Sequence, residues 1–379
     1  MNIGILREPA EDRRVAMLPE TVSQIIKMNV QVKVESGAGN GAMVSDDDFK
    51  NAGATICNRD EIFSSCQIIL KINPVSKDEI SRLTDSSVLV NVFQPLVNKE
   101  IVLSLLDKNV TSFSLDMIPR TTRAQAMDIL SSQATASGYK AVLLAATHLP
   151  KFFPMFMTAA GSIVPAKVLI LGAGVAGLQA IATAKRLGGV VEVFDTRAAV
   201  KEEVKSLGAK FIEVEGAADS AAAGGYAVEQ SKEFLERQKQ KIHESAAKSD
   251  VIICTAQIPG RKAPVLISTQ TVEAMKPGSV IVDLAASTGG NCEVTKNNET
   301  ISYKGITVIG NSYLPSTIPA DASKMFGKNV LNFLKLIINK EGNLNLNFDD
   351  DIVKGSCITH HKEIIHSKVK EAASVGSFQ

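Results

Sequence analysis

The sequence predicts an α/β protein with two doubly wound, Rossmann-like parallel-sheet domains, the first of them discontinuous. Short β-branched runs alternate with amphipathic helical stretches in the first third of the chain, and a second alternation of this kind begins at Lys167. The length of 379 residues also exceeds what one hydrophobic core ordinarily organises. We expect residues 1–130 and 320–379 to form one domain and residues 131–319 the other.

The first alternation supplies the elements of the N-terminal domain in order. Its strand-like runs are NIGILRE, QVKVESG, ATICN, QIILKIN, SVLVNVF and TSFSLDMI. The intervening helical stretches are PETVSQIIKMN, SKDEISRL and KEIVLSLLDKN. A further helix, ASGYKAVLLAATHL, leads toward the second domain. Strands separated by helices in this way favour a parallel sheet with helices on both faces.

The second alternation predicts about six strands, KVLILGA, VVEVFD, AKFIEV, DVIICTA, SVIVDLA and ITVIG. Residues 214–230 interrupt it with small side chains, which predicts a mobile loop. The stretch ADASKMFGKNVLNFLKLIIN places apolar residues at helical spacing and predicts a long helix. The tail NLNLNFDDDIVKGSCITHHKEIIH has the pattern of short strands and turns, so we expect it to return to the first domain.

Composition excludes several classes of function. A formal net charge of +1 gives no general attraction to nucleic acid or anionic lipid. The five cysteines show no C-x-x-C spacing, which favours free thiols in a reducing compartment. No apolar run is long enough for a membrane span, so we expect a soluble or peripheral chain. The histidines of CITHHKEIIH follow a strand and turn pattern, and we expect no metal site there.

The strongest local signal is a dinucleotide-binding motif. Gly172, Gly174 and Gly177 form G-x-G-x-x-G between a buried-type strand and a helix. In such motifs the first glycine permits a tight turn, the second lets the backbone approach a pyrophosphate, and the third allows close packing of helix and strand. Asp195 ends the next strand, 21 residues after Gly174, where a carboxylate can bind the adenine ribose hydroxyls.

Asp195 also bears on the choice of cofactor. A carboxylate beside a 2′-phosphate costs on the order of 4 kcal/mol at ~4 Å with an effective dielectric constant of ~20. NAD(H) is therefore favoured over NADP(H). Arg197 weakens this preference, because an arginine at this place can serve a 2′-phosphate.

Four longer stretches make the chain similar to one family. They are RRVAMLPE, PRTTRAQAMDILSSQ, MTAAGSIVPAKVLILGAGVAGLQAIATAKRLG and LAASTGGNC. They resemble the family that joins alanine dehydrogenase to the NAD(H)-binding part of proton-translocating nicotinamide nucleotide transhydrogenase. The resemblance covers nearly the whole chain, and its two branches catalyse different reactions.

The alanine dehydrogenase branch needs a general acid/base, because water and ammonia are exchanged at a carbonyl carbon. That branch carries a histidine where this chain has Gln94 and Pro95, and an aspartate where it has Ser287. Arg14 and Lys71 match the residues with which that branch contacts its substrate, although ion pairing explains both equally well. Hydride transfer between two nicotinamides needs no such acid/base, so the missing groups favour the transhydrogenase branch.

The stretch PRTTRAQAMDILSSQ matches the transhydrogenase branch closely. The resemblance implies that Arg120, Gln125 and Asp128 contact the nicotinamide end of NAD(H), with Ser131 as a nearby hydroxyl. Tyr226, in GGYA, resembles the tyrosine of a mobile loop that closes over the nucleotide; an exposed linker residue is the alternative. The full set expected to bind the cofactor is Arg120, Gln125, Ala126, Met127, Asp128, Gly172, Ala173, Gly174, Val175, Gly177, Asp195, Thr196, Arg197, Gly225, Thr255 and Ala256.

The resemblance implies a subunit that passes hydride from NADH to NADP+ bound on a partner chain, with proton movement in a membrane-spanning partner. It implies a homodimer at the cytoplasmic face of the membrane or its organellar equivalent. From the composition of the sequence itself we expect no membrane span and no nucleic-acid partner. A soluble alanine dehydrogenase and a non-catalytic NAD-binding module are the alternatives.

Overall fold

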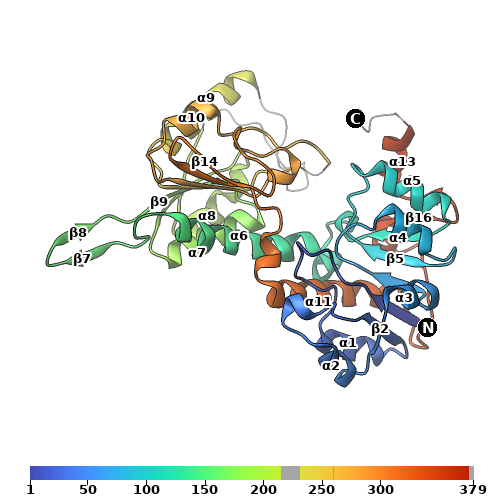
Figure 1. Ribbon diagram of the computed structural model, residues 1–379. Helices are drawn as coiled ribbons and strands as arrows, with labels where there is room; N and C mark the ends of the chain where they lie inside the picture. The colour runs from blue at the N-terminus through green and yellow to red at the C-terminus, as the bar shows by residue number, and fades with distance from the viewer. Residues whose placement is uncertain (215–230, 259, 375–379) are drawn as a thin grey trace. The chain divides into compact units, whose positions relative to one another are not determined.

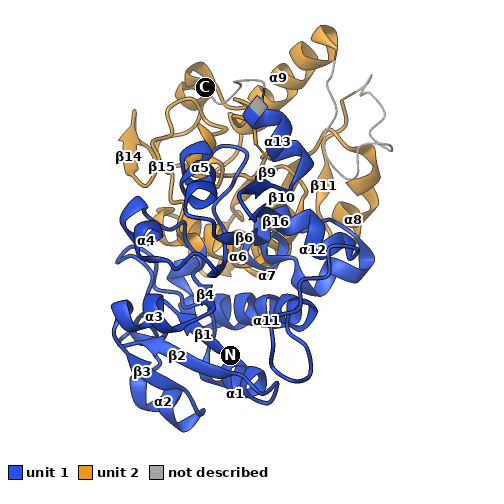
Figure 2. Cartoon of the chain, turned by 90° about the vertical axis from the view of Figure 1, so that its right-hand side faces the viewer, with its two compact units in different colours: residues 1–133, 315–379 blue, residues 134–314 orange. Residues whose placement is uncertain are grey.

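The computed structural model describes residues 1–214, 231–258 and 260–374. The chain divides into two compact units, which Figure 2 colours separately. Unit 1 comprises Met1–Gln133 and Pro315–Gln379, and unit 2 comprises Ala134–Leu314. Each unit is built on its own sheet.

Unit 1 contains an eight-stranded sheet in the order β17-β16-β6-β5-β4-β1-β2-β3. Neighbouring strands from β6 to β3 are parallel. The strands are β1 (Asn2–Ile5), β2 (Gln31–Glu35), β3 (Thr55–Cys57), β4 (Ile68–Leu70), β5 (Val88–Asn91), β6 (Thr111–Ser114), β16 (Cys357–His360) and β17 (Glu363–Ile364). The chain leaves β1 toward β2 and β3 on one side, and later returns to add β4, β5 and β6 on the other.

Both faces of this sheet are buried, which explains its apolar strands. In β4, Ile68 and Leu70 face one core while Ile69 faces the other. The first core includes residues of α1 (Pro19–Ile26), α2 (Asp46–Asn51), α11 (Pro319–Ile337) and α12 (Asp351–Ser356). The second includes residues of α3 (Arg59–Ser65), α5 (Lys99–Asp107), α4 (Lys77–Arg82) and α13 (Ser367–Ser374).

The C-terminal segment completes unit 1. The β16 strand pairs antiparallel with β6, and β17 pairs antiparallel with β16. Cys357 and Ile358 are fully buried, one in each core. The tail also contains α12, whose N-cap Asp350 accepts hydrogen bonds from two backbone N–H groups, and this helix was not predicted.

Unit 2 contains a seven-stranded sheet in the order β11-β10-β9-β12-β13-β15-β14. Its strands are β9 (Lys167–Leu171), β10 (Val190–Phe194), β11 (Lys210–Phe211), β12 (Val251–Cys254), β13 (Val280–Asp283), β14 (Thr300–Tyr303) and β15 (Ile306–Ile309). All pairs are parallel except β14–β15. The helices of the unit are α7 (Val175–Arg186), α8 (Lys201–Ser206), α9 (Lys232–Ala246) and α10 (Thr269–Glu273), while α6 (Ile129–His148) begins in unit 1.

The fold class is confirmed, and the antiparallel edge strand β14 is an addition to it. A second addition is the two-stranded hairpin β7 (Phe156–Thr158) and β8 (Gly161–Ile163), which extends away from the body of unit 2 (Figure 1). All six of its strand residues are exposed. With no buried face, the hairpin has no alternating pattern by which its strands could be predicted.

Candidate functional site

The glycine-rich turn joins β9 to α7 at the point where the order of strands reverses, between β9 and β12. Gly172 has a φ of +100°, a conformation that favours glycine. A Cβ on Gly177 would collide with the carbonyl oxygen of Gly172, so this glycine lets the helix approach the turn. Gly174 differs from both, because its φ is −76° and a Cβ there would meet nothing within 4 Å.

Neither backbone conformation nor packing within the described residues therefore requires a glycine at position 174. A ligand that approaches the backbone closely does require one, and a dinucleotide pyrophosphate is such a ligand. Gly174 is also the N-cap of α7 and provides no side-chain cap, so the first N–H groups of the helix face outward. This turn fits a dinucleotide.

Asp195 follows β10 and reaches back to this turn. Its Oδ2 atom accepts a hydrogen bond of 2.7 Å from the backbone N–H of Ala173. Arg197 donates to the same carboxylate from its backbone N–H, Nε and Nη2 at 2.8, 2.9 and 2.7 Å. Asp195 thus fixes the turn, and its charge is compensated by Arg197 before any ligand binds. Thr196 lies between them and is half-buried.

Thr255 and Ala256 follow β12, the strand on the other side of β9. The hydroxyl of Thr255 donates to the carbonyl oxygens of Leu171 and Gly172 at 3.1 and 3.0 Å. Asn291 holds Ala256 from both sides, since its Oδ1 accepts from the backbone N–H at 3.0 Å and its Nδ2 donates to the carbonyl at 2.8 Å.

Sequence reasoning missed Asn291, and it also missed Asp283. Asp283 ends β13, it is fully buried, and desolvation by burial raises the pKa of its carboxyl. Its Oδ2 accepts from the backbone N–H groups of Asn291 and Cys292 and from the hydroxyl of Thr295 at 2.8–3.0 Å. Asp283 thereby positions Asn291, which positions Ala256. A chain of contacts between separate loops leaves no periodic signal in the sequence.

Three of the residues predicted from PRTTRAQAMDILSSQ line a pocket of about 290 Å³ in unit 1. Arg120, Gln125 and Asp128 all contribute to its wall. The segment contains the 3₁₀ helix η3 (Thr122–Met127), after which α6 begins at Ile129. Two asparagines of α11 hold η3 in place, because Asn329 and Asn332 donate to the carbonyl of Ala126 at 2.8 and 3.1 Å.

Asp128 and Ser131 form the junction between η3 and α6. The Asp128 carboxylate accepts from the backbone N–H of Ser131 at 2.9 Å and from its hydroxyl at 2.6 Å. Met127 points into the core and is 7% exposed, so only its backbone is available to a ligand. Arg120 and Gln125 are exposed. The two exposed polar side chains therefore stand on a segment that is anchored on both sides.

Arg14 and Lys71 are both held in ion pairs. The Arg14 guanidinium donates to Asp12 through Nε at 2.9 Å and Nη2 at 2.5 Å. The buried Lys71 ammonium donates to both oxygens of Glu79 at 2.9 and 2.8 Å. Both pairs lie within unit 1. Gln94, with a φ of +49°, is exposed, as is Ser287 in unit 2.

The predicted site residues thus form two groups. Gly172, Ala173, Gly174, Val175, Gly177, Asp195, Thr196, Arg197, Thr255 and Ala256 lie around the carboxyl ends of β9, β10 and β12 in unit 2. The group around Arg120 belongs to unit 1. Gly225 and Tyr226 lie outside the described residues. Within the described ranges, no set of three metal-ligating side chains is placed to hold an ion, and no helix is long and apolar enough to cross a membrane.

A parallel sheet with a glycine turn at its switch point and an acid after the next strand defines a Rossmann-type dinucleotide-binding protein. The sequence narrows this class further. Residues 4–137 match the model of the alanine dehydrogenase/PNT N-terminal domain, and residues 141–367 match that of the C-terminal domain. The chain belongs to the alanine dehydrogenase/PNT family.

Relatives of both branches are similar to the chain. It is 44% identical over 377 residues to the first part of the NAD(P) transhydrogenase alpha subunit of Rhodospirillum rubrum, covering 97% of this chain and 98% of that protein. It is 26% identical over 378 residues to the alanine dehydrogenase of Mycolicibacterium smegmatis, covering 97% of this chain and 96% of that protein. The crystal structure of transhydrogenase from Sinorhizobium meliloti has a TM-score of 0.88 at 38% identity and covers 96% of this chain and 100% of that chain. The relatives support NAD binding by an oxidoreductase of this family.

Proposed function

We propose that this chain is the NAD(H)-binding subunit of a proton-translocating NAD(P)+ transhydrogenase and passes hydride from NADH to NADP+ bound on a partner chain. The observation that carries the proposal is the set of side chains available for proton transfer. The two positions at which the other branch holds its acid/base carry Gln94 and Ser287. Neither side chain titrates near neutral pH. Arg14 and Lys71 are already paired with Asp12 and Glu79.

A direct transfer between two nicotinamides asks the protein to bind, orient and exclude water. NADH supplies the hydride when bound. The turn around Gly174 receives the pyrophosphate, Asp195 and Arg197 receive the adenine ribose, and Thr255 and Ala256 line the next strand end. Arg120, two residues before η3, and Gln125, within it, hold the nicotinamide end, and Asp128 with Ser131 fixes the end of η3.

The proposal requires partner subunits for activity. The second nucleotide, NADP(H), binds to a partner chain, and a membrane-spanning partner moves the proton. The Rhodospirillum rubrum relative is named as the first part of an alpha subunit, which supports a divided complex. The Haemophilus influenzae relative named "NAD(P) transhydrogenase subunit alpha" is longer, and the 368 aligned residues cover 72% of it at 44% identity. We place the subunit in the cytoplasm, peripheral at the inner face of the cell membrane.

The proposal also includes a homodimer, which the β7–β8 hairpin supports. Four large apolar side chains in and beside the hairpin are exposed to solvent. Their exposed fractions are 61% for Met155, 42% for Phe156, 76% for Met157 and 69% for Val164. A projecting hairpin with an apolar surface and open strand edges needs a covering partner. A second copy of the chain provides one.

Two assays on the purified chain test the proposal. Reconstituted with its membrane and NADP(H)-binding partners, the chain should support hydride transfer from NADH to an NADP+ analogue. Without partners it should not transfer hydride. Rapid NADH oxidation with pyruvate and ammonia would instead identify an alanine dehydrogenase, and NADH binding without transfer in the reconstituted complex would identify a non-catalytic module.

A further inference from the structure

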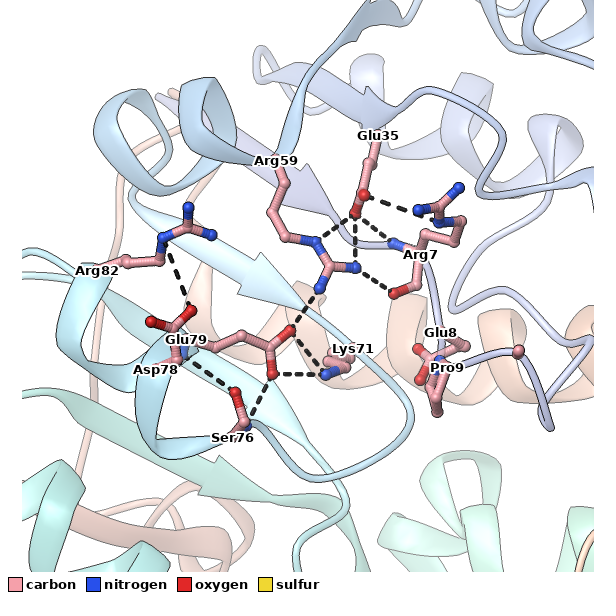
Figure 3. A pocket seen from close by; sticks show the side chains of 11 residues that line it. Arg7, Glu8, Pro9, Glu35, Arg59, Lys71, Ser76, Asp78, Glu79 and Arg82 are labelled. Carbon is pink, nitrogen blue, oxygen red and sulfur yellow. Dashed lines mark hydrogen bonds and ion pairs between the residues drawn. The ribbon is translucent and has the colours of Figure 1, made fainter.

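Unit 1 contains a charged pocket of about 810 Å³ to which the proposed function assigns no role (Figure 3). Its residues lie at or shortly after the carboxyl ends of β1, β2, β3 and β4. The strand order reverses here, because β1 pairs with β2 on one side and β4 on the other. In open α/β sheets, ligands bind in the crevice at such a reversal. The pocket therefore occupies the position in unit 1 where the fold is built to take a ligand.

The two units repeat one arrangement at this position. The order β3-β2-β1-β4-β5-β6 in unit 1 corresponds to β11-β10-β9-β12-β13-β15 in unit 2. In unit 2 the acid after the second strand, Asp195, accepts from Ala173 N–H at 2.7 Å. In unit 1 the acid at the end of the second strand, Glu35, accepts from Arg7 N–H at 2.8 Å. The pocket thus corresponds to the dinucleotide crevice of unit 2.

The turn itself differs. After β1 the chain reads Arg7-Glu8-Pro9, with none of the glycines that let a backbone approach a pyrophosphate. Cationic side chains surround the pocket in their place: Arg7, Arg59, Lys71 and Arg82. A second dinucleotide is therefore excluded by the turn, whereas a smaller anion is not.

The buried carboxylates of the pocket already accept hydrogen bonds from other groups of the protein. Glu79 accepts from Lys71 at 2.8 and 2.9 Å, from Arg59 at 2.8 Å and from the Ser76 N–H at 2.7 Å. Arg59 also donates to Glu35 at 3.0 Å, so it bridges the two acids (Figure 3). Glu8 accepts from two backbone N–H groups and from the Asn73 amide. These acids therefore have little capacity left to bind a cation.

The guanidinium groups of Arg7 and Arg82 have N–H donors that are not used in their ion pairs. Among the described residues, the Arg7 guanidinium approaches one carboxylate, Glu35, at 3.9 Å, and its side chain is 59% exposed. Arg82 is 40% exposed and pairs with Asp60 through Nη2 at 2.6 Å, with Asp78 as far as 4.0 Å from its Nε. A guanidinium has five N–H donors, so both retain donors for a ligand. The pocket thus offers donors from the segment after β1 and from α3 and α4, while Asp78, 81% exposed, is in the described part of the chain the one lining carboxylate that keeps open acceptors.

We propose that this pocket binds a small phosphate-bearing metabolite, held by Arg7, Arg59 and Arg82. Guanidinium groups on three segments suit a tetrahedral oxyanion, which accepts hydrogen bonds from several directions. The volume leaves room for an organic group beside the phosphate. None of these three arginines is among the residues proposed to bind NAD(H).

Inorganic phosphate is the probe for a first test on the full chain. Thermal unfolding is followed as phosphate replaces chloride at constant ionic strength, since a ligand of the folded state raises the melting temperature. Arg7→Ala and Arg82→Ala should each weaken the phosphate response about tenfold. Lys50→Ala, which removes one positive charge from an exposed pair on α2, should leave the response unchanged. NADH binding should be equal in all four proteins.

No stabilisation beyond that in chloride would overturn the proposal. So would equal stabilisation of the wild type and both arginine variants, because the phosphate would then bind elsewhere. Equal NADH titrations show that unit 2 is intact, which keeps this outcome independent of the hydride-transfer assay.

Discussion

Asp195 and Arg197 form a two-pronged ion pair directly after β10, with Arg197 Nη2 2.7 Å from Oδ2 and Nε 2.9 Å from Oδ1. The pair is largely buried, with side-chain exposures of 6% and 19%, and it raises the pKa of Arg197. The acid that would repel a 2′-phosphate and the arginine that would attract one are therefore coupled. Selectivity for NADH depends on the pair rather than on the carboxylate alone.

Asp195→Ala should relax discrimination against NADPH. The substitution removes the repulsion and releases Arg197 to meet a 2′-phosphate, so the ratio of NADPH to NADH dissociation constants should fall by roughly tenfold or more. Fluorescence titrations with both nucleotides measure it. Arg197→Ala is the matched control and should raise the ratio, because an uncompensated carboxylate remains. An unchanged ratio in both variants would refute the role assigned to the pair.

Arg120→Ala should slow hydride transfer in the reconstituted complex by roughly tenfold to a hundredfold, because a misplaced nicotinamide loses the aligned geometry of transfer. Arg123→Ala is the control. Arg123 lies three residues away, pairs with Asp350 and Asp351, and does not line the pocket. Transfer rates and melting temperatures of both variants separate a loss of function from a loss of fold. Equal rates in the two variants would show that the pocket is not the nicotinamide site.

The fold could be predicted because its strands are buried on both faces and its helices on one. The periodicity of apolar residues therefore marks β1, β9 and α11. The C-terminal tail has too few strands to form a sheet by itself, which is why its return to the first domain was expected. The elements that were missed lack this burial contrast. The hairpin β7–β8 is exposed throughout. Helix α2 buries one side chain, Phe49, and α3 buries two adjacent ones, Ile62 and Phe63, so neither shows a helical period.

The candidate site was predictable where short-range spacing carries it. Gly172 and Gly177 are required by backbone conformation and packing, and both requirements are encoded locally. Asn291 holds Ala256 from 35 positions away, and Asp283 acts through Asn291. Contacts of this kind depend on how loops meet at the end of a sheet. They leave no periodic pattern of residues that could be recognised in a single sequence.

Met157→Asp should dissociate the proposed homodimer. A charge placed on the 76% exposed apolar hairpin has to be desolvated when a second copy covers it, so the dimer dissociation constant should rise by about tenfold to a hundredfold. Sedimentation equilibrium measures this change. Met43→Asp serves as the control, because Met43 is a comparably exposed methionine, at 74%, in unit 1. A wild-type monomer, or a dimer insensitive to Met157, would contradict the hairpin interface.

Glu8 should make the stability of unit 1 depend on pH. Desolvation raises the pKa of its carboxyl from 4.5 to about 7, against the three N–H donors that favour the ionised form. The folded state then holds the proton more tightly than the unfolded state. Its contribution is fully present below pH 4.5 and is lost as the pH rises to about 7. The loss amounts to roughly 3 kcal/mol.

Urea unfolding of wild type and Glu8→Gln across this pH range isolates the effect. The difference in unfolding free energy between them should change with pH in favour of Glu8→Gln as the pH rises. Glu11→Gln, at an exposed position in the same loop, should follow the wild type. Parallel pH profiles for wild type and Glu8→Gln would show that the carboxyl does not titrate in this window.

Gly174→Ala and Gly177→Ala should separate ligand binding from folding. A Cβ at position 174 meets nothing within 4 Å. The free energy of unfolding of Gly174→Ala should therefore lie within about 1 kcal/mol of the wild-type value. The same Cβ should occupy space that a pyrophosphate needs, so NADH affinity should fall about tenfold or more. A Cβ at position 177 collides with the Gly172 carbonyl, and this variant should lose about 1–3 kcal/mol of stability. Chemical unfolding and NADH titration measure both quantities on each protein. If Gly174→Ala binds NADH as tightly as the wild type, the nucleotide does not approach the backbone at this turn, and the cofactor site assigned to unit 2 is wrong.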